Sequence, residues 1–592
     1  MTTTRTAPQR NPNPHAAPIR TVELSNPYAR VSWFVICFTF ALSLIVARLI
    51  ELQVFESKSL ARAGERVRLQ TSVQPALRGM ITDVNGVPIA TTVIARNITV
   101  SQVDVKDPHG TAKKLAPLLN LPVQTIEDRI TGNKQFNYVA KQVSPAVSKK
   151  IAALQLPGIW SQPTTKRVYP AGTLASTVVG YVGTEGHGLG GIESWMDKRL
   201  SGVDGKQTID RVNGREIPTT EKNASDAVDG LTVRLTIDRD LQALAERTLA
   251  ERVTTVGATG GDVIVMDPKT GNILAMATYP LFDPNYPNQT SDHAKQSTAV
   301  TDAFEPGSTG KAITIAAVLE EGAADPTTPF TIKKNIKRGG TVFHDHDPHD
   351  TIHLTLNGIL AKSSNIGAIQ ASDLIGQDKL LFYLDKFGIG HPTGLDFPGE
   401  SPGIMPKPGG PEWSDTTFPT LAFGQGVSVT ALQVASVYAT IANDGVRVTP
   451  RLIDGYVDAA GSFSPTDPSQ TTRVISSTTA KTMRQMLEGV VSKDGTAPAA
   501  QIPGYRIAGK TGTANRWSDT AHGYKGYTAS FVGFAPAEDP SLVIAVMIQD
   551  PVNGHFGSTV SAPVFRKVMM YALAQQKIPP STTKPHPFPV TW

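Results

Sequence analysis

The sequence predicts a mixed α/β (α+β) protein that is attached to a membrane by one N-terminal helix. Three observations support this fold class. An apolar run near the N-terminus is long enough to cross a bilayer. Residues 228–577 begin and end with strand patterns and have helical patterns between them. The 592 residues, 40% hydrophobic and 18% charged, exceed one core and are typical of several folded domains.

The membrane anchor is predicted over residues 28–52. Residues 31–47 contain no charged side chain, and a helix rising about 1.5 Å per residue crosses most of the bilayer over that length. The preceding tail, residues 1–27, is expected to be disordered and cytoplasmic, because its arginines face a single acid, Glu23. The alternatives are a buried core helix and a cleaved signal peptide, but ARLIELQVFE is a poor cleavage site. We therefore expect an uncleaved anchor with the following domains outside the cytoplasm.

Two domains and a tail are expected after the anchor. Residues 53–227 combine short apolar runs with Gly/Pro turns and indicate one or two small domains of spacer type. In residues 228–577, LTVRLTID predicts a strand and DLQALAERTLAERV a helix, followed by a hairpin with strands at 263–266 and 273–277. YTASFVGFAP and SLVIAVMIQD predict a second strand pair, so an antiparallel sheet would join distant parts of the chain. Residues 578–592 are expected to be a flexible tail.

The net charge and the cysteine content argue against a nucleic-acid-binding protein and against an intrachain disulfide. The net charge of +5 is spread without a long Lys/Arg run, which argues against nucleic-acid binding and fits a membrane or cell-wall environment. The single cysteine, Cys37, lies in the apolar run and excludes an intrachain disulfide.

The first candidate catalytic residues are Ser308 and Lys311, in the segment FEPGSTGK. Pro and Gly set up a turn, and the apolar run that follows predicts a buried helix ending at Gly322. Residues three apart share a helix face, so the Lys311 amine would approach the Ser308 hydroxyl. Burial would lower the pKa of the amine and make it a base for a serine nucleophile. A Ser-x-x-Lys pair also arises by chance, and a surface serine near a solvated lysine is the alternative.

Two further motifs support this interpretation. Ser363 and Asn365, in a short break between helical patterns, could relay a proton and hydrogen-bond an amide substrate, although a helix cap would look the same. Lys510, Thr511, Gly512 and Thr513 fall on a predicted edge strand, where they could bind a carboxylate and supply an oxyanion-hole N–H. Ser-x-x-Lys, a Ser/Asn motif and Lys-Thr-Gly together are a known set of β-lactamases and penicillin-binding proteins.

The chain as a whole resembles a class B penicillin-binding protein, the monofunctional peptidoglycan D,D-transpeptidase type, and among these the septal, cell-division member. Besides the three motifs, the resemblance rests on segments spread from the anchor to about residue 572: ARLIELQ, RGMITDVNGVPIA, RVYPAG, GGIESWMDKRLSG, LTIDRDLQ, EWSD, FGQGVSVTALQ, YTASFVGFAP and VSAPVF.

The resemblance implies a non-catalytic pedestal followed by a β-lactamase-like transpeptidase domain. It assigns the nucleophile to Ser308, the base to Lys311, a proton shuttle to Ser363 and a substrate-amide contact to Asn365. Lys510, Thr511, Gly512 and Thr513 become the carboxylate and oxyanion side.

The resemblance also implies partners and a location. The substrates would be peptidoglycan stem peptides ending in D-Ala-D-Ala, and β-lactam antibiotics would acylate Ser308. No cofactor or metal is implied. Residues 53–227 do not resemble a glycosyltransferase module, so a glycan-polymerising membrane partner and other division proteins are expected. The chain would sit in the cell membrane, with its catalytic domain extracytoplasmic, at the division septum.

Several alternatives remain at this stage. The chain could be an elongation-type class B transpeptidase, a hydrolase such as a carboxypeptidase or β-lactamase, or a non-catalytic scaffold or β-lactam sensor. The segment FHDHDPHDTIHL, residues 343–354, could bind a transition metal. We favour a polar loop there, because the proposed mechanism needs no metal.

Overall fold

The computed structural model describes residues 27–55, 58, 69–212, 215–518 and 522–592. They fall into two compact units. The first comprises Met1–Ser72 and Gln207–Ala224, and the second Val73–Lys206 and Ser225–Trp592. The disordered tail predicted for residues 1–27 lies outside the described residues except for Pro27.

The first unit contains the predicted anchor. Helix α1 (Pro27–Ile50) continues into η1 (Glu51–Phe55), and Tyr28–Phe55 is the one helix in the described ranges that is long and apolar enough to cross a membrane. None of the apolar stretch is buried against protein, which argues against a core helix. Within the part of the chain that the structure describes, there is therefore one candidate membrane span, at the predicted place. The same unit holds most of a three-stranded sheet in the order β1-β6-β7, with bounds Leu69–Gln74, Gly205–Val212 and Arg215–Ser225.

The N-terminal half of the second unit is built on a seven-stranded sheet. Its order is β17-β16-β8-β2-β3-β4, and β5 also pairs with β3. The bounds are Phe463–Pro465, Ile453–Val457, Thr232–Leu235, Ile81–Thr82, Pro88–Val100, Asn137–Val143 and Ile159–Val168. Three helices, α3 (Pro108–Leu119), α4 (Val123–Ile130) and α5 (Pro145–Ala153), close a small separate core with β3 and β4.

Three of the motifs that carried the resemblance meet in one buried ion-pair network. Glu193, fully buried in α7 (Gly191–Trp195), accepts 2.7 Å hydrogen bonds from Arg78 Nε and from Arg167 Nε. Arg78 NH1 also donates to Asp197 at 2.7 Å. Removing one partner would leave an uncompensated buried charge, which costs about 3–5 kcal/mol. The network therefore joins RGMITD, RVYPAG and GGIESWMDKRLSG, which are far apart in sequence.

The C-terminal half of this unit is organised around a five-stranded antiparallel sheet in the order β10-β9-β21-β20-β19. Both predicted strand pairs are confirmed: β9 (Gly260–Met266) with β10 (Ile273–Tyr279), and β20 (Gly523–Ala535) with β21 (Leu542–Gln549). Strand β19 (Ala508–Ser518) is the edge. Every residue of β21 is buried, so both faces of the sheet are covered.

Helices cover the two faces of this sheet. Helices α9 (Arg239–Val256) and α18 (Ala562–Gln575) contact each other and the sheet. Helix α15 (Ala431–Ala442), buried at every residue, contacts β9, β20 and β21. Asp238 caps α9 by accepting from two backbone N–H groups, and Gly257 ends it at φ 65°, so the predicted helix is confirmed.

A further group of helices in this half lies around Ser308 and Ser363, the residues proposed for catalysis. They are α11 (Lys311–Glu320), α12 (Leu356–Lys362), α13 (Asn365–Lys386), α14 (Thr417–Leu421) and α16 (Ser477–Val491). Helix α11 contacts α12, α13 and α16, and α12 contacts α13 and α16, which brings the segments around residues 308 and 363 to the same place.

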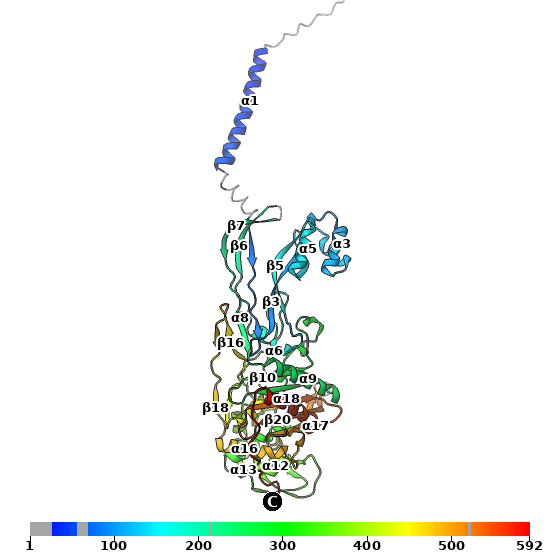
Figure 1. Cartoon of the computed structure of the whole chain (residues 1–592), viewed down its shortest axis with the longest axis vertical. Coiled ribbons are helices and arrows are strands. Elements are labelled where there is room, and N and C mark those ends of the chain that lie inside the picture. Colours follow the sequence, from blue (N-terminus) through cyan, green and yellow to red (C-terminus); the bar gives the residue numbers. More distant parts are fainter. Residues whose placement is uncertain (1–26, 56–57, 59–68, 213–214, 519–521) are drawn as a thin grey trace, which may run out of the picture. The chain divides into compact units, whose positions relative to one another are not determined.

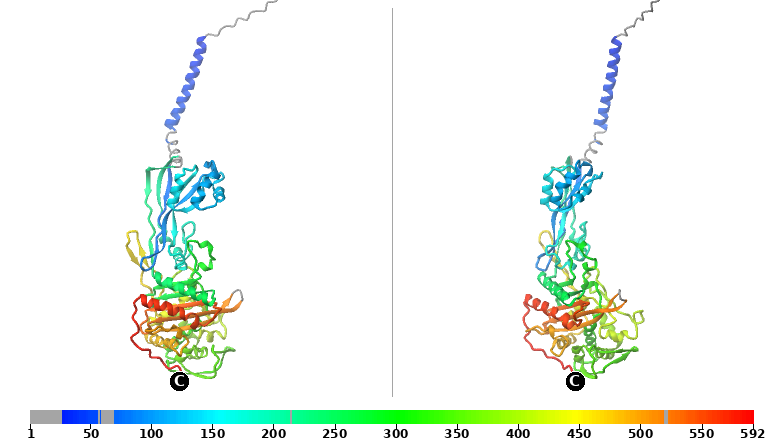
Figure 2. Two further views of the ribbon diagram at one scale, coloured as in Figure 1. Left: turned by 45° about the vertical axis from the view of Figure 1, so that its right-hand side comes forward. Right: turned by 90° about the vertical axis from the view of Figure 1, so that its right-hand side faces the viewer.

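The C-terminal segment differs from the flexible tail expected from its composition. Figure 2 shows this segment in red, running from the end of α18 over the surface of the second unit. Its backbone carbonyls at Phe588 and Val590 accept hydrogen bonds from Asn357 Nδ2 (3.0 Å) and Thr355 N (3.0 Å). A segment with few apolar side chains is thus ordered by polar contacts to its main chain, which composition does not reveal.

Candidate active site

Ser308 lies on a tight turn whose left-handed backbone at residue 307 favours glycine. It sits in η5 (Gly307–Thr309) directly before α11, as predicted. Gly307 has φ 52°, and its N–H donates to Gly424 O at 2.8 Å. A Cβ on Gly424 would lie 2.1 Å from Gly307 O, so a side chain there would displace the turn. The FGQG segment noted in the sequence therefore braces the turn that holds Ser308.

The structure brings Lys311 and Ser363 to the Ser308 hydroxyl, as the sequence predicted. Lys311 is fully buried, and its Nζ donates to Ser308 Oγ at 3.1 Å and to Ser363 Oγ at 3.2 Å. Ser363 Oγ donates to Ser308 Oγ at 2.9 Å. The same nitrogen lies 2.7 Å from Asn365 Oδ1 and 2.6 Å from the backbone carbonyl of Ser363, so its N–H groups are shared among four oxygen atoms. A hydroxyl with a base in contact is the arrangement that serine nucleophiles require.

Ser363 occupies the break between α12 and α13 that the sequence indicated. It ends α12 in the left-handed region at φ 62°, and Ser364 then caps α13 by accepting from Gly367 N. This turn points Ser363 and Asn365 to the same amine. Asn365 Nδ2 donates to His344 O at 3.2 Å, which fixes the orientation of the amide.

The edge strand β19 closes the other side of the cluster. Lys510 is fully buried, and its Nζ donates to Ser363 Oγ at 2.8 Å. A Cβ on Gly512 would lie 2.3 Å from Ser530 Oγ and 3.0 Å from Pro306 O, so glycine lets the strand approach the nucleophile turn. Thr511 is buried beside Lys510, and half-buried Thr513 accepts from Gly557 N at 3.3 Å. All eight predicted residues thus lie in or beside one cluster.

Burial changes the protonation of both lysines. Desolvation lowers the pKa of Lys311 to about 7, against a smaller opposing effect from the Asp345 carboxylate. Desolvation also lowers the pKa of Lys510 well below its usual value, and the neighbouring Lys311 lowers it further. A large fraction of Lys311 is therefore neutral at physiological pH and able to accept a proton.

The His/Asp segment packs behind this cluster. Asp345 Oδ1 accepts from Ile366 N at 2.9 Å in the first turn of α13, and Asp345 Oδ2 lies 3.1 Å from His349 Nε2. Within the described ranges, no group of three or more His, Cys, Asp or Glu side chains is placed to hold a metal ion. The sequence reasoning missed this role of Asp345, although the density of His and Asp marked the segment.

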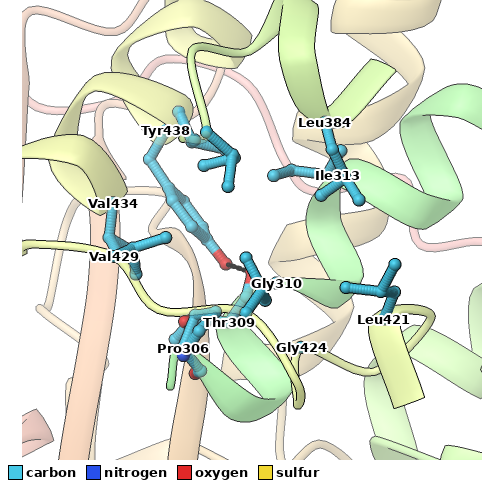
Figure 3. A pocket seen from close by; sticks show the side chains of 13 residues that line it. Pro306, Thr309, Gly310, Ile313, Leu384, Leu421, Gly424, Val429, Val434 and Tyr438 are labelled. Carbon is cyan, nitrogen blue, oxygen red and sulfur yellow. Dashed lines mark hydrogen bonds between the residues drawn. The ribbon is translucent and has the colours of Figure 1, made fainter. Parts of the chain in front are cut away.

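An apolar pocket lies directly behind the nucleophile turn. Figure 3 shows its lining, which comes from the turn itself and from α11, α13, α14 and α15, and includes Ile313, Leu384, Leu421 and Val434. The buried Tyr438 hydroxyl crosses it and donates to Thr309 O at 2.9 Å. This hydrogen bond holds the residue after Ser308 in place. No motif in the sequence indicated a role for Tyr438.

Comparison with known proteins places these features in a family. Residues 261–570 match the family described as the penicillin binding protein transpeptidase domain, and residues 73–235 match the penicillin-binding protein dimerisation domain. The penicillin-binding protein PbpB of Mycolicibacterium smegmatis is 35% identical over 579 residues, covering 91% of this chain and 89% of that protein. The peptidoglycan D,D-transpeptidase FtsI of Escherichia coli is 34% identical over 558 residues, covering 92% of this chain and 91% of that one.

A solved structure shows the same architecture. The crystal structure of penicillin binding protein 3 from Mycobacterium tuberculosis, complexed with aztreonam, matches with a TM-score of 0.70 and 32% sequence identity. The match covers 88% of this chain and 100% of that chain.

Proposed function

The chain belongs to the penicillin-binding protein transpeptidase family, and we propose that it is a peptidoglycan D,D-transpeptidase that works through an acyl-enzyme on Ser308. One observation carries the assignment to this serine: the buried Lys311 amine and the Ser363 hydroxyl both lie within hydrogen-bond distance of Ser308 Oγ. Ser308 is itself only half-buried, so a substrate can reach it.

In the first step, neutral Lys311 accepts the proton of Ser308 as Ser308 Oγ attacks the penultimate D-alanyl carbonyl carbon of a stem peptide. A pKa of about 7 for Lys311 supports this role, because an amine with an ordinary pKa would be protonated at neutral pH. The carbonyl C–N bond then breaks, and the terminal D-Ala leaves as its amine after receiving a proton through Ser363. Contact of Ser363 Oγ with Ser308 and with both lysines supports this relay.

The Lys-Thr-Gly strand holds the substrate. Lys510, Thr511 and Thr513 bind the terminal carboxylate, and Asn365 contacts the substrate amide. The backbone N–H groups of Ser308 and Thr513 stabilise the oxyanion. Support comes from the position of β19 at the free edge of the sheet, where an extended peptide can pair with the main chain.

In the second step, an amine of a neighbouring stem peptide attacks the ester and takes the acyl group, and Ser308 Oγ recovers its proton. A β-lactam takes the place of the D-Ala-D-Ala terminus: its ring opens as the lactam carbonyl is esterified, and the amine stays attached. The ligand aztreonam in the solved relative supports this proposal.

We place the reaction at the division septum, outside the cytoplasmic membrane, with the N-terminus in the cytoplasm. The arginine-rich N-terminal residues, the candidate span and the likeness to proteins named PbpB and FtsI support this. Glycan polymerisation would come from a membrane partner within the division machinery. A fluorescent fusion that labels the whole cell wall evenly, rather than the septum, would favour the elongation-type alternative.

Intact-mass measurement after incubation with a fluorescent penicillin tests the acyl-enzyme. We expect one stable adduct, and peptide mapping should locate it on Ser308. Ser308→Ala should remove the adduct without unfolding the protein, because the side chain is only half-buried. An adduct on another residue would refute the assignment, and rapid release of hydrolysed penicillin would favour the hydrolase alternative. Normal division with Ser308→Ala as the sole copy would favour a scaffold.

A further inference from the structure

The C-terminal strap, which we define as residues 578–592, is attached to the second unit at two separated places. The first attachment lies at the loop before β19. Tyr505 Oη donates to Ile578 O at 2.7 Å, and Ser581 N donates to Gly504 O at 2.9 Å. The strap thus begins against the residues that lead into the Lys-Thr-Gly strand.

Arg506 fixes this attachment to the strand and to a neighbouring helix. Its backbone N–H donates to Ser581 Oγ at 2.9 Å, and its guanidinium donates to Thr583 Oγ1 at 2.6 Å. The same guanidinium forms a bidentate pair with Glu488 of α16, at 2.6 and 2.8 Å. Because β19 begins two residues later, the strap holds the start of the strand that carries Lys510.

The second attachment lies at the start of α12. Thr591 forms an antiparallel bridge with Leu354, so the strap adds a short strand beside β14 (Ile352–Thr355). Thr355 N and Asn357 Nδ2 donate to strap carbonyls at 3.0 Å each. Trp592 Nε1 donates to the carbonyl of Phe330 at 3.1 Å, on the neighbouring strand β11 (Pro329–Ile332).

The strap and the first turn of α12 are in close contact. A Cβ on Gly358 would lie 2.0 Å from Val590 O, so the first turn of α12 has a glycine where the strap passes. Asn357 is buried, and among the described residues its amide nitrogen donates to the strap carbonyls of Phe588 and Pro589. Without the strap, this buried donor would lose its partners, which is costly.

The second attachment leads directly to the active site. Thr355 is the N-cap of α12, its side chain accepting from Gly358 N, and Ser363 is the C-cap of the same helix. The helix spans seven residues and is almost entirely buried, so it moves as a rigid piece. A shift at its first turn therefore reaches Ser363 at its last.

We propose that the C-terminal strap is a positioning element of the transpeptidase site, tying the start of the strand that carries Lys510 to the start of the helix that ends at Ser363. The strap holds β19 and α12 at the relative position that the 2.8 Å contact between Lys510 Nζ and Ser363 Oγ requires. This inference rests on the proposed function, since the relative position of β19 and α12 affects the reaction only if Ser308 is acylated between them.

Deleting residues 588–592 from the full chain tests the proposal. Acylation by a fluorescent penicillin is followed in stopped flow at a temperature where the circular dichroism of both proteins is native. We expect the acylation rate constant to fall by about 3- to 30-fold, because a misplacement of about 1 Å can cost about 100-fold and the first attachment, which remains, should hold the shift below that. The dissociation constant of the initial complex should change by less than about 2-fold, because the strap's hydrogen bonds are to Asn357, Tyr505 and Arg506 and not to the residues proposed to hold the substrate.

Two further measurements separate positioning from folding. A synthetic peptide of residues 584–592 added to the shortened protein should restore the rate. Asn357→Leu removes the hydrogen bonds to Phe588 and Pro589 but keeps the strap, so it should lower the acylation rate constant by a smaller factor. This variant replaces the shortened protein in the test if the shortened chain does not fold. Lys584→Ser is the matched control, because Lys584 is exposed between the two attachments, and it should behave as the unaltered protein.

An unchanged rate constant in the shortened protein would overturn the proposal. So would a lower melting temperature with an unchanged rate constant, which would make the strap purely structural. A full-length protein that is not labelled on Ser308 would refute the proposed function instead, so the two failures are distinguishable.

Discussion

The pH dependence of Ser308 acylation tests whether Lys311 is the base. Only the neutral amine can accept the proton, so the rate follows the neutral fraction of Lys311. With a pKa of about 7, that fraction is about 1% at pH 5 and about 90% at pH 8. We therefore expect the acylation rate constant to rise about 90-fold between these pH values and to level off near pH 8.

Two titratable groups lie near this amine, and the Asp345 carboxylate gives the expectation a direction. Lys510 lies across the Ser363 hydroxyl, and Asp345 lies behind Asn365. The Asp345 carboxylate favours the ammonium form and so raises the pKa of Lys311 against the lowering by burial. Asp345→Asn keeps an acceptor for Ile366 N but removes the charge. The pKa of Lys311 should fall further, and the acid limb of the profile should move to lower pH.

The assay is single-turnover labelling with a fluorescent penicillin from pH 5 to pH 10, corrected for spontaneous hydrolysis of the drug. Lys311→Met should lose labelling by about 1,000-fold or more. Lys481→Met is the matched control, because Lys481 is exposed on α16, and it should leave the profile unchanged. A rate that keeps rising tenfold per pH unit up to pH 10 would refute the reasoning, since it would mean a base with the pKa of a solvated lysine.

Three other expectations concern the supports of the site and of the sheet. Tyr438→Phe should cost about 1–3 kcal/mol in denaturant unfolding, because the buried Thr309 carbonyl loses its donor, and a stability equal to the unaltered protein would contradict this brace. Gly512→Ala should slow acylation by about tenfold or more, because the new methyl group lies 2.3 Å from Ser530 Oγ; unchanged labelling would show that the strand can move. Burial raises the pKa of Asp262 to about 7, so the folded state binds the extra proton between about pH 4 and pH 7 and stability falls as pH rises through that window. Asp262→Asn should therefore raise the melting temperature at pH 8 and not at pH 4, and an equal effect at both would exclude this cause.

Patterns tied to local geometry were predictable from the sequence. The hairpin of β9 and β10, the helix after Asp238 and the turn at Ser363 follow from periodicity, caps and breaks. The candidate site was predictable because its three motifs are short and specific in combination. The direction of each hydroxyl and the depth of burial of Lys510 depend on the packing of several elements, which these short motifs do not encode.

Hydrogen bonds between residues far apart in the sequence could not be predicted in the same way. Tyr438 is one apolar-patterned helix position among twelve in α15, and nothing local shows that its hydroxyl meets Thr309 O. The strap has the composition of a disordered tail, and its order depends on Asn357 and Thr355, more than two hundred residues earlier. Such contacts are set by the packing of whole elements, which single-sequence patterns do not contain.

The hydrogen bonds of Ser363 decide between the two residues that could act as base. A hydroxyl has one donor and two acceptor positions. Ser363 Oγ uses its donor toward Ser308 Oγ and accepts from the Lys510 amine at 2.8 Å. The two N–H groups of neutral Lys311 are directed at its closest acceptors, Ser363 O at 2.6 Å and Asn365 Oδ1 at 2.7 Å. Ser363 Oγ therefore cannot take a proton from Ser308 until its own has left, whereas neutral Lys311 has a free lone pair 3.1 Å from Ser308 Oγ. The geometry thus favours Lys311 as the first acceptor and leaves Ser363 to deliver a proton to the leaving amine, which is the order that acylation followed by expulsion requires.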